Sequence, residues 1–155
     1  PNKEGKLSEA DIRSLRGFRQ LYANTFTDNL LAKAKVTCAL SEGKGRNVID
    51  DNYDTSVRPK MKDGKAVFSF KLNKPATFNV LSVQEDIRKG QRVEKFSLEV
   101  KDAKGNWKKV TEGTTVGHKR LLKFPVETAK EVRLIISEVR AVPAISEIGL
   151  YRLRD

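Results

Sequence analysis

The chain has 155 residues, of which 38% are hydrophobic, and its formal net charge at pH 7 is +11. A chain of this length is most simply one domain, which can bury roughly 68–70% of its extended surface on folding. No apolar run approaches the roughly 18 residues that a membrane-spanning helix needs, so we expect no such span. The N-terminus, PNKEGKLSEADIR, is polar and lacks a signal-peptide pattern.

The first predicted element is a helix over about residues 8–25. Ser8 is a candidate N-cap, and Asp11, three residues later, completes a capping box. Apolar residues then recur at spacings of three and four, which places on one face Ile12, Leu15, Phe18, Tyr22 and Phe26. The helix is expected to lie within a connecting segment formed by residues 1–33.

From residue 34 onward the apolar period changes to two, which indicates half-buried strands. Phe96, Leu98 and Val100 alternate with polar residues. Comparable patterns occur at 66–72, 77–83, 109–111, 119–124, 131–137 and 145–153. Turn signals separate them at 62–65, 73–75, 88–91 and 103–106. Short strands at this spacing predict an all-β, antiparallel sandwich or barrel over residues 34–155.

The basic residues are spread along the chain rather than gathered in one run. There are 31 Lys and Arg residues against 20 Asp and Glu, with local clusters at 60–65 and 119–123. No run of roughly five or six like charges occurs, and no RNA-binding or helix-turn-helix pattern is visible. We therefore expect no nucleic-acid partner. Two interpretations remain, a solvated basic surface or one that binds an acidic or sulfated glycan.

The sequence contains no recognisable active site. The only cysteine, Cys38, cannot form an internal disulfide, and it is expected to pack as a small apolar residue. The only histidine, His118, has no GxSxG, HExxH or phosphate-binding glycine loop nearby. Paired glycosidase carboxylates face each other about 5–10 Å apart across a sugar. Glu85 and Asp86 are adjacent, and neighbours in a strand point to opposite faces, so they do not form such a pair.

An acidic stretch, NVIDDNYDTS at 47–56, contrasts with the basic charge of the whole chain. Repulsion among Asp50, Asp51 and Asp54 must be offset by a cation, by hydrogen bonds or by water. An EF-hand beginning at Asp50 fails, because Thr55 replaces the required Gly and Met61 replaces the required Glu. Calcium accepts about six to eight oxygens in flexible geometry. Two interpretations therefore stay open, an Asx-rich turn and a metal site.

The β region contains the stretches IDDNYDTS, GNWKKV, EVRLII and AISEIGLY. Together they resemble the discoidin-like domain, the coagulation-factor C-type or galactose-binding-like jelly-roll sandwich, many members of which bind sugars. The chain also contains NKEGKLSEADIRSLRGF, VLSVQEDIRKGQRVEKFSLEV and GTTVGHKRLLKFP. These resemble the C-terminal portion of bacterial α-L-fucosidases, and the match covers nearly the whole chain.

The resemblance implies an accessory role. In such fucosidases a catalytic (β/α)₈ barrel precedes the sandwich, and a barrel of about 250 residues does not fit in this chain. The catalytic residues would belong to the barrel, so we expect no hydrolysis by this chain and expect the barrel as its partner. The start at Pro1 and a single methionine, Met61, agree with a piece of a longer glycoside hydrolase. The extracellular substrates of such enzymes imply an exported, periplasmic or extracellular location.

The resemblance also implies one structural Ca²⁺. In discoidin-like sugar-binding modules, a loop resembling LDGNxxT and a glutamate of the last strand commonly hold a calcium ion. Here these positions correspond to Asp50, Asn52 and Thr55 in the loop and to Glu147 in AISEIGLY. They are expected to meet because the first and last strands of the sandwich lie side by side. Asp51 stands where the family often has Gly.

Carbohydrate is the expected ligand, although its contacts vary among these modules. His118 and Arg120 are candidate hydrogen-bond donors to sugar hydroxyls. Glu85 and Arg92 lie in a loop that resembles the fucosidases and that would alternatively pack against the barrel. Trp107 is expected to pack on the sandwich, and if exposed it would offer a platform for a sugar. Three functions stay open: an accessory fucosidase domain that holds galactose- or fucose-containing glycans, an autonomous lectin-like module for anionic glycans, and a structural appendage without a ligand.

Overall fold

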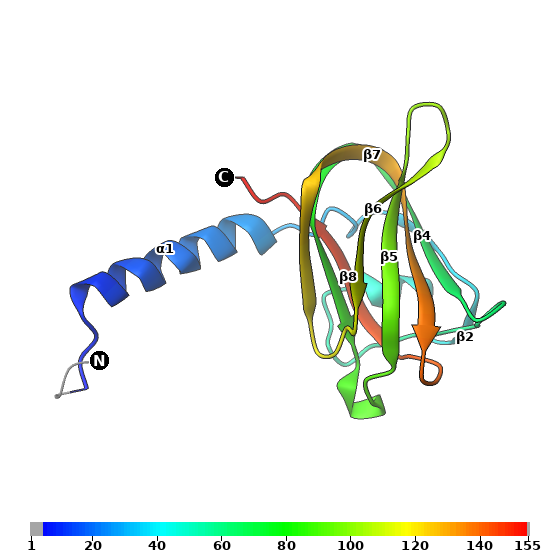
Figure 1. Ribbon diagram of the computed structural model, residues 1–155, viewed down its shortest axis with the longest axis horizontal. Coiled ribbons are helices and arrows are strands. Elements are labelled where there is room, and N and C mark those ends of the chain that lie inside the picture. Colours follow the sequence, from blue (N-terminus) through cyan, green and yellow to red (C-terminus); the bar gives the residue numbers. More distant parts are fainter. Residues whose placement is uncertain (1–4, 155) are drawn as a thin grey trace.

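The computed structural model describes residues 5–154 and shows a β-sandwich from which one N-terminal helix projects (Figure 1). The helix is α1 (Glu9–Phe26). The strands are β1 (Lys35–Thr37), β2 (Leu40–Glu42), β3 (Arg58–Pro59), β4 (Ala66–Glu85), β5 (Val93–Lys101), β6 (Trp107–Thr114), β7 (Arg120–Val139) and β8 (Ile145–Tyr151). Two short 3₁₀ helices, η1 (Gly45–Val48) and η2 (Ile87–Lys89), lie in the connections. The expected fold class is confirmed, because the paired strands run antiparallel in a sandwich that follows one helix.

α1 begins with the predicted capping box. The Ser8 hydroxyl accepts a hydrogen bond from the Asp11 amide (3.2 Å), and the Asp11 carboxylate accepts one from the Ser8 amide (3.2 Å). The last turn contacts the sandwich, where the rings of Phe26 and Tyr151 meet edge to face with centroids 4.9 Å apart. The rest of α1 extends away from the strands (Figure 1). Within residues 5–154, no helix is both long and apolar enough to span a bilayer.

Two strands are longer than the sequence pattern predicted. The segments 66–72 and 77–83 belong to one strand, β4, and 119–124 and 131–137 belong to one strand, β7. The signal at 73–75 is not a reversing turn, because β4 and β7 remain partners on both sides of it. Their register shifts between Lys71 and Ala76, around Pro75, which has no amide hydrogen for the strand ladder. This irregularity bends the strand instead of ending it.

The bend makes one sheet form both layers of the sandwich. In one layer the strand order is β1-β4-β7-β5-β6, and the C-terminal half of β4 carries β8 on its other edge. Figure 1 shows β7 arching from one layer to the other. Side chains between the layers form the core, including the fully buried Phe68, Phe70, Phe78, Phe96, Leu81, Leu98, Leu134 and Ile136.

Cys38 lies at the edge of this core. It is half-buried and packs against the core cluster, as expected for a small apolar residue. Burial raises the pKa of its thiol to about 11, so the thiol stays protonated near neutral pH.

Gly113 in β6 provides a test of this packing. A Cβ atom at this position would lie 2.8 Å from Cζ of Phe96 and 3.0 Å from Cδ1 of Leu122. We expect Gly113→Ala to lower the free energy of unfolding by about 1–3 kcal/mol, measured by urea denaturation, because the buried Phe96 ring must shift. Gly17→Ala is the control, since a Cβ there meets nothing within 4 Å and alanine favours a helix. Equal stability of the Gly113→Ala variant and the parent chain would contradict the packing described.

Candidate functional site

The acidic turn lies against the last strand of the sandwich. Val57 follows the turn and exchanges two backbone hydrogen bonds with Ile145 of β8, each 2.9 Å long. Before the turn, the side chains of Val48 and Ile49 are buried in the core. The expected reason for this proximity was wrong, because the first strand, β1, pairs with β4 and not with the last strand. The segment that includes Val57 makes the contact with β8.

Two side chains fold the turn locally. The Asp50 carboxylate accepts a hydrogen bond from the Asn52 amide (3.1 Å), and the Asn52 side-chain oxygen accepts one from the Asp54 amide (3.0 Å). Both are Asx turns. Between them Asp51 has a φ of 55°, in the left-handed region that favours glycine and tolerates aspartate. The turn therefore needs a residue that tolerates a positive φ at position 51.

Oxygen atoms converge on the Thr55 hydroxyl. Thr55 Oγ1 lies 3.0 and 2.9 Å from the two carboxylate oxygens of Asp50. It also lies 3.1 Å from the carbonyl oxygen of Asn52 and 3.4 Å from that of Asn47. One hydroxyl has a single hydrogen to donate, so it cannot satisfy four neighbouring oxygens at once. An oxygen-rich group of this kind, with one carboxylate, carbonyls and a hydroxyl, fits the ligand preference of calcium.

Glu147 meets the same turn at its backbone. Its carboxylate accepts hydrogen bonds from the Asp51 amide (3.2 Å) and from the Asn29 side-chain amide (3.3 Å). The side chain is buried, and burial is the main cause that raises its pKa to about 8. The nearby carboxylates of Asp50 and Asp51 raise the pKa further, while the two hydrogen bonds lower it. The structure therefore brings Glu147 to the turn, as predicted, in a position where its negative charge is incompletely compensated.

Asn29 is a member of this site that the sequence analysis missed. Its side-chain oxygen accepts hydrogen bonds from the amides of Leu31 (3.0 Å) and Leu150 (3.2 Å), and its nitrogen donates to the carbonyl of Ile148 (3.0 Å). It therefore holds the connection after α1 against β8 and orients Glu147. The only sequence signal was its turn-forming residue type, because its partners in β8 lie about 120 positions away.

The groups that could hold a metal are side-chain and backbone oxygens of different kinds. Within residues 5–154, no three His, Cys, Asp or Glu side chains converge on one point. Asp50, Asn52 and Thr55 instead combine side-chain and backbone oxygens, and Glu147 lies beside them. Such a site would suit one hard cation and would offer nothing to a soft metal that prefers sulfur or imidazole.

A second concave site lies beside the turn, and we call it the Tyr53 pocket. It has a volume of about 260 Å³ and is lined by Tyr53, Asp54, Glu85, Asp86, Ile87, Arg88, His118 and Ser146. The rings of Tyr53 and His118 stack, with centroids 5.6 Å apart and planes 17° apart. Tyr53 is 53% exposed, so the stacked pair presents aromatic surface to solvent at the rim.

Arg88 connects the loops around the Tyr53 pocket. Its guanidinium donates hydrogen bonds to Asp86 (2.7 Å), to Asp54 (2.9 Å) and to the carbonyl of Tyr53 (3.0 Å). The hydrogen bond and charge of Arg88 lower the pKa of Asp86 below its usual value, against the effect of burial. Sequence reasoning missed Arg88 and Tyr53, because the pairing of the 50–56 turn with the β4–β5 loop exists only in the folded chain.

The four residues predicted to contact sugar occupy different environments. His118 lies at the rim of the Tyr53 pocket, whereas Arg120 is exposed at the start of β7, outside the pocket lining. Glu85 is buried, and its carboxylate accepts hydrogen bonds from the amides of Arg92 (2.8 Å), Val93 (3.1 Å) and Gly117 (3.1 Å). The Arg92 guanidinium donates to the carbonyl of Val142 (2.8 Å). Glu85 and Arg92 thus hold loops together, and His118 has the position best suited to a ligand.

Comparison with known proteins places the sandwich and the helix in longer chains. The F5/8 type C domain model matches residues 32–148. Alpha-L-fucosidase 1 of Arabidopsis thaliana is 35% identical over 159 aligned residues, which cover 97% of this chain and 31% of that protein. The crystal structure of SpGH29 superposes with a TM-score of 0.91 at 29% identity, covering 100% of this chain and 34% of that one.

A GH29 fucosidase from Ruminococcus gnavus, solved in complex with fucose, superposes with a TM-score of 0.82 at 30% identity. The match covers 100% of this chain and 32% of that one. The chain therefore spans about a third of the length of these relatives. They include a plant protein, so the resemblance is not limited to bacterial enzymes.

The raised pKa of Glu147 predicts a pH dependence of stability. Because folding favours the protonated form, this contribution is complete below about pH 4.5 and is lost as the pH rises through about 8. In calcium-free buffer, Glu147→Gln should therefore gain about 1–3 kcal/mol of unfolding free energy relative to the parent chain between pH 5 and pH 9. Urea denaturation at each pH measures this difference. Glu138→Gln, at an exposed glutamate, should show no such trend, and parallel profiles for Glu147→Gln and the parent would refute the assignment.

Proposed function

Because the chain belongs to the F5/8 type C domain family, we propose that it is the non-catalytic accessory domain at the C-terminal end of an α-L-fucosidase. In this role it packs on the catalytic barrel through α1. The end of the sandwich that carries the acidic turn and the Tyr53 pocket, which we call the loop end, faces glycans. Nearly the whole of this chain matches only about a third of each fucosidase relative, which supports the accessory role. An exported or extracellular location is part of the same proposal, since a glycan-binding domain acts where glycans are found.

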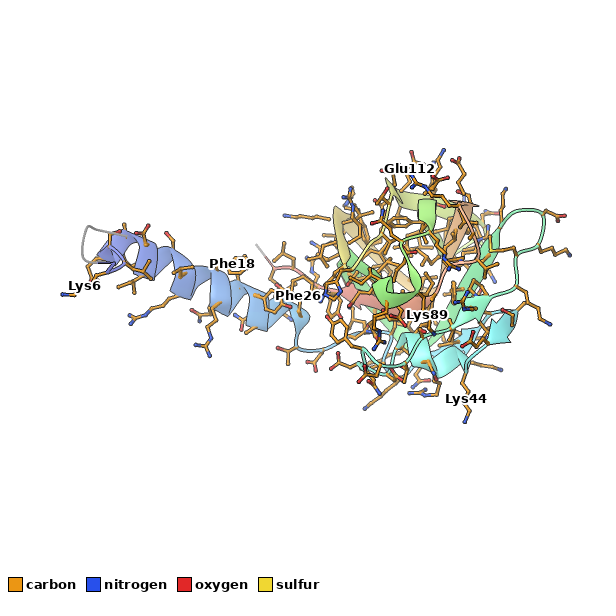
Figure 2. The ribbon with its side chains drawn as sticks, turned by 90° about the horizontal axis from the view of Figure 1, so that it is seen from below. Lys6, Phe18, Phe26, Lys44, Lys89 and Glu112 are labelled. Atoms are coloured by element: carbon orange, nitrogen blue, oxygen red, sulfur yellow. The ribbon has the colours of Figure 1, made fainter. Side chains whose placement is uncertain are left out.

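The observation that carries the proposal is the unpartnered apolar face of α1. Phe18, Leu15 and Tyr22 are 66%, 55% and 45% exposed, although they lie on one face of the helix. Figure 2 shows the helix extending from the sandwich, with Phe18 along its length and Phe26 at its base. An exposed row of large apolar side chains on a soluble domain marks an interaction surface. A helix of this kind gains most of its stability from packing its apolar face.

The joint between α1 and the sandwich is also open. A cavity of about 580 Å³ lies there and is lined by Leu21, Asn24, Thr25, Thr27, Asp28, Leu30, Arg152 and Arg154. The cavity and the apolar face both involve α1, and both are left open by the described residues. Two thirds of each fucosidase relative lies outside the matched region, which leaves room for a barrel of about 250 residues. We propose that this barrel covers the apolar face of α1.

Calcium is the second part of the proposal. Asp50, Asn52 and Thr55 would hold the ion through side-chain and backbone oxygens, next to the carboxylate of Glu147. The ion would supply positive charge, which would offset the repulsion among the carboxylates of the turn. It would thereby fix the turn that positions Tyr53 at the rim of the neighbouring pocket.

Neutral sugar is the third part. The stacked rings of Tyr53 and His118 offer a flat apolar surface, and Asp54 and Arg88 lie beside it with polar atoms. Sugar-binding pockets combine such apolar surface with a few polar groups that orient the ligand. We propose that the Tyr53 pocket contacts galactose- or fucose-containing glycans.

Phe18→Ser tests the packing of α1 on the barrel. Loss of one buried aromatic contact should lower the stability of the full-length enzyme by about 1.5–3 kcal/mol, measured as a fall in Tm. The same substitution should leave the Tm of the present chain unchanged, because Phe18 is exposed there. Arg16→Ser, on the polar side of the helix, should affect neither protein. An unchanged Tm of full-length Phe18→Ser would remove the support for the proposal.

Thr55→Val tests the calcium site, with Thr55→Ser as the variant that keeps the hydroxyl. Calcium at about 100 times its Kd stabilises a folded protein by about 2.7 kcal/mol. EDTA should therefore lower the Tm of the parent chain and of Thr55→Ser, and added calcium should restore it. The Tm of Thr55→Val should not respond to either. If neither EDTA nor calcium changes the Tm of the parent chain, the turn is held by its hydrogen bonds alone.

A further inference from the structure

A further concave surface lies on the outer face of the sheet, and it shares no lining residue with the Tyr53 pocket. One cavity of about 580 Å³ is lined by Thr37, Cys38, Ala39, Lys60, Lys62, Asp63, Lys65, Val67 and Ser69. Another, of about 300 Å³, is lined by Lys35, Thr37, Ser69, Phe70, Lys71, Trp107, Glu131 and Val132. The cavities share Thr37 and Ser69, which are register partners in β1 and β4. They therefore form one groove across these strands, which we call the lysine groove.

The lysine groove carries positive charge that its own acids do not balance. Its lining includes five lysines, Lys35, Lys60, Lys62, Lys65 and Lys71, against the two acids Asp63 and Glu131. Among residues 5–154, the ammonium groups of Lys35, Lys60, Lys62 and Lys65 have no ion pair or hydrogen-bond partner. Glu131 is shared, at 3.9 Å from Lys71 and 3.3 Å from Lys101 of the adjacent strand.

This arrangement differs from that of two other basic residues of the sheet. On the same sheet Arg133 pairs with Glu99 at 2.6 Å, and Lys108 pairs with Glu127 at 2.7 Å. Unpaired like charges that face one groove repel each other and raise the local concentration of anions. Several unpaired lysines thus line this one groove.

Trp107 forms the far wall of the groove. Its indole ring is half-buried, with the Arg133 guanidinium 4.3 Å and the Lys101 ammonium 5.8 Å from the ring centroid. These cation–π contacts hold the ring against the sheet, which accounts for the expected packing role. The ring also adds apolar surface next to the hydroxyls of Thr37 and Ser69. Lysines, hydroxyls and one aromatic wall together suit a polymer that carries both anionic groups and sugar rings.

We propose that the lysine groove binds an anionic polysaccharide, with its sulfate or carboxylate groups paired to Lys60, Lys62 and Lys65. The proposal rests on the accessory role argued above, because it names a substrate class that such a domain would hold for its enzyme. A membrane surface is less suited, because membrane binding needs several exposed apolar side chains. The described lining offers one large one, Val67, at 39% exposure. Nucleic acid is less suited because the groove has one aromatic ring and no row of stacking platforms.

The test compares two triple variants of equal charge. Lys60→Gln, Lys62→Gln and Lys65→Gln together alter the groove, whereas Lys44→Gln, Lys74→Gln and Lys119→Gln alter exposed lysines elsewhere. Heparin and dextran sulfate serve as probes, with neutral dextran as the uncharged reference, in titration calorimetry at about 0.05 and 0.5 M NaCl. We expect the parent chain to bind both sulfated probes, more weakly at the higher salt concentration. The groove variant should lose at least about tenfold in affinity and the control variant less than about twofold.

Several outcomes would overturn the proposal. Equal losses in the two triple variants would show that net charge alone attracts the probes. Equal binding of neutral dextran, or tighter binding of duplex DNA or of phosphatidylserine vesicles at the same salt, would assign the groove to another partner. A Tyr53→Ala variant separates the two sugar sites, because it should weaken binding to neutral fucosylated and galactosylated glycans and leave heparin binding intact. Failure of heparin binding while Phe18→Ser still destabilises the full-length enzyme would reject the groove and leave the accessory role standing.

Discussion

The pairing of β4 with β7 across both layers is the constraint on which the rest of the structure depends. Each strand has 20 residues, and the two remain partners through a bend instead of ending at it. Because the C-terminal half of β4 also pairs with β8, the bend sets where Glu147 lies. The same half of β4 ends at Glu85, whose carboxylate holds the loops on either side. A change in the bend would therefore move the acidic turn and the Tyr53 pocket together.

Three carboxylates are buried at this end of the sandwich, and the chain compensates each one differently. Glu85 accepts three backbone amides, and Asp86 is paired with Arg88. Glu147 has two weaker hydrogen bonds and faces two further carboxylates, so its pKa is raised instead of lowered. Buried charge without a partner is strongly unfavourable, and a group in this position takes up a proton or a cation. This contrast singles out the Glu147 turn from the structural carboxylates nearby.

The domain separates three chemistries onto three parts of its surface. α1 offers an apolar face, the loop end offers stacked aromatic rings with polar neighbours, and the outer sheet face offers unpaired lysines. Such separation is compatible with the proposed accessory role, in which one surface contacts the catalytic barrel and the others contact ligands. The fold also places four unpaired lysines in one groove. Specificity for neutral or anionic glycans would then reside in different loops and strands of one scaffold.

The sequence by itself determined the helix with its Ser8 cap, the alternation that indicates buried strands and the acidic turn with its candidate oxygen ligands. These are local properties, fixed by residue spacing and by hydrogen bonds over two or three positions. Only the tertiary structure decided that four predicted strands are two, that Asn29 joins the Glu147 site and that Tyr53 stacks on His118. It also placed Glu85 inside as a structural acid and brought lysines of β1, of β4 and of the loop before β4 into one groove. These features depend on contacts between residues tens of positions apart, which cross-strand pairing creates and local spacing does not encode.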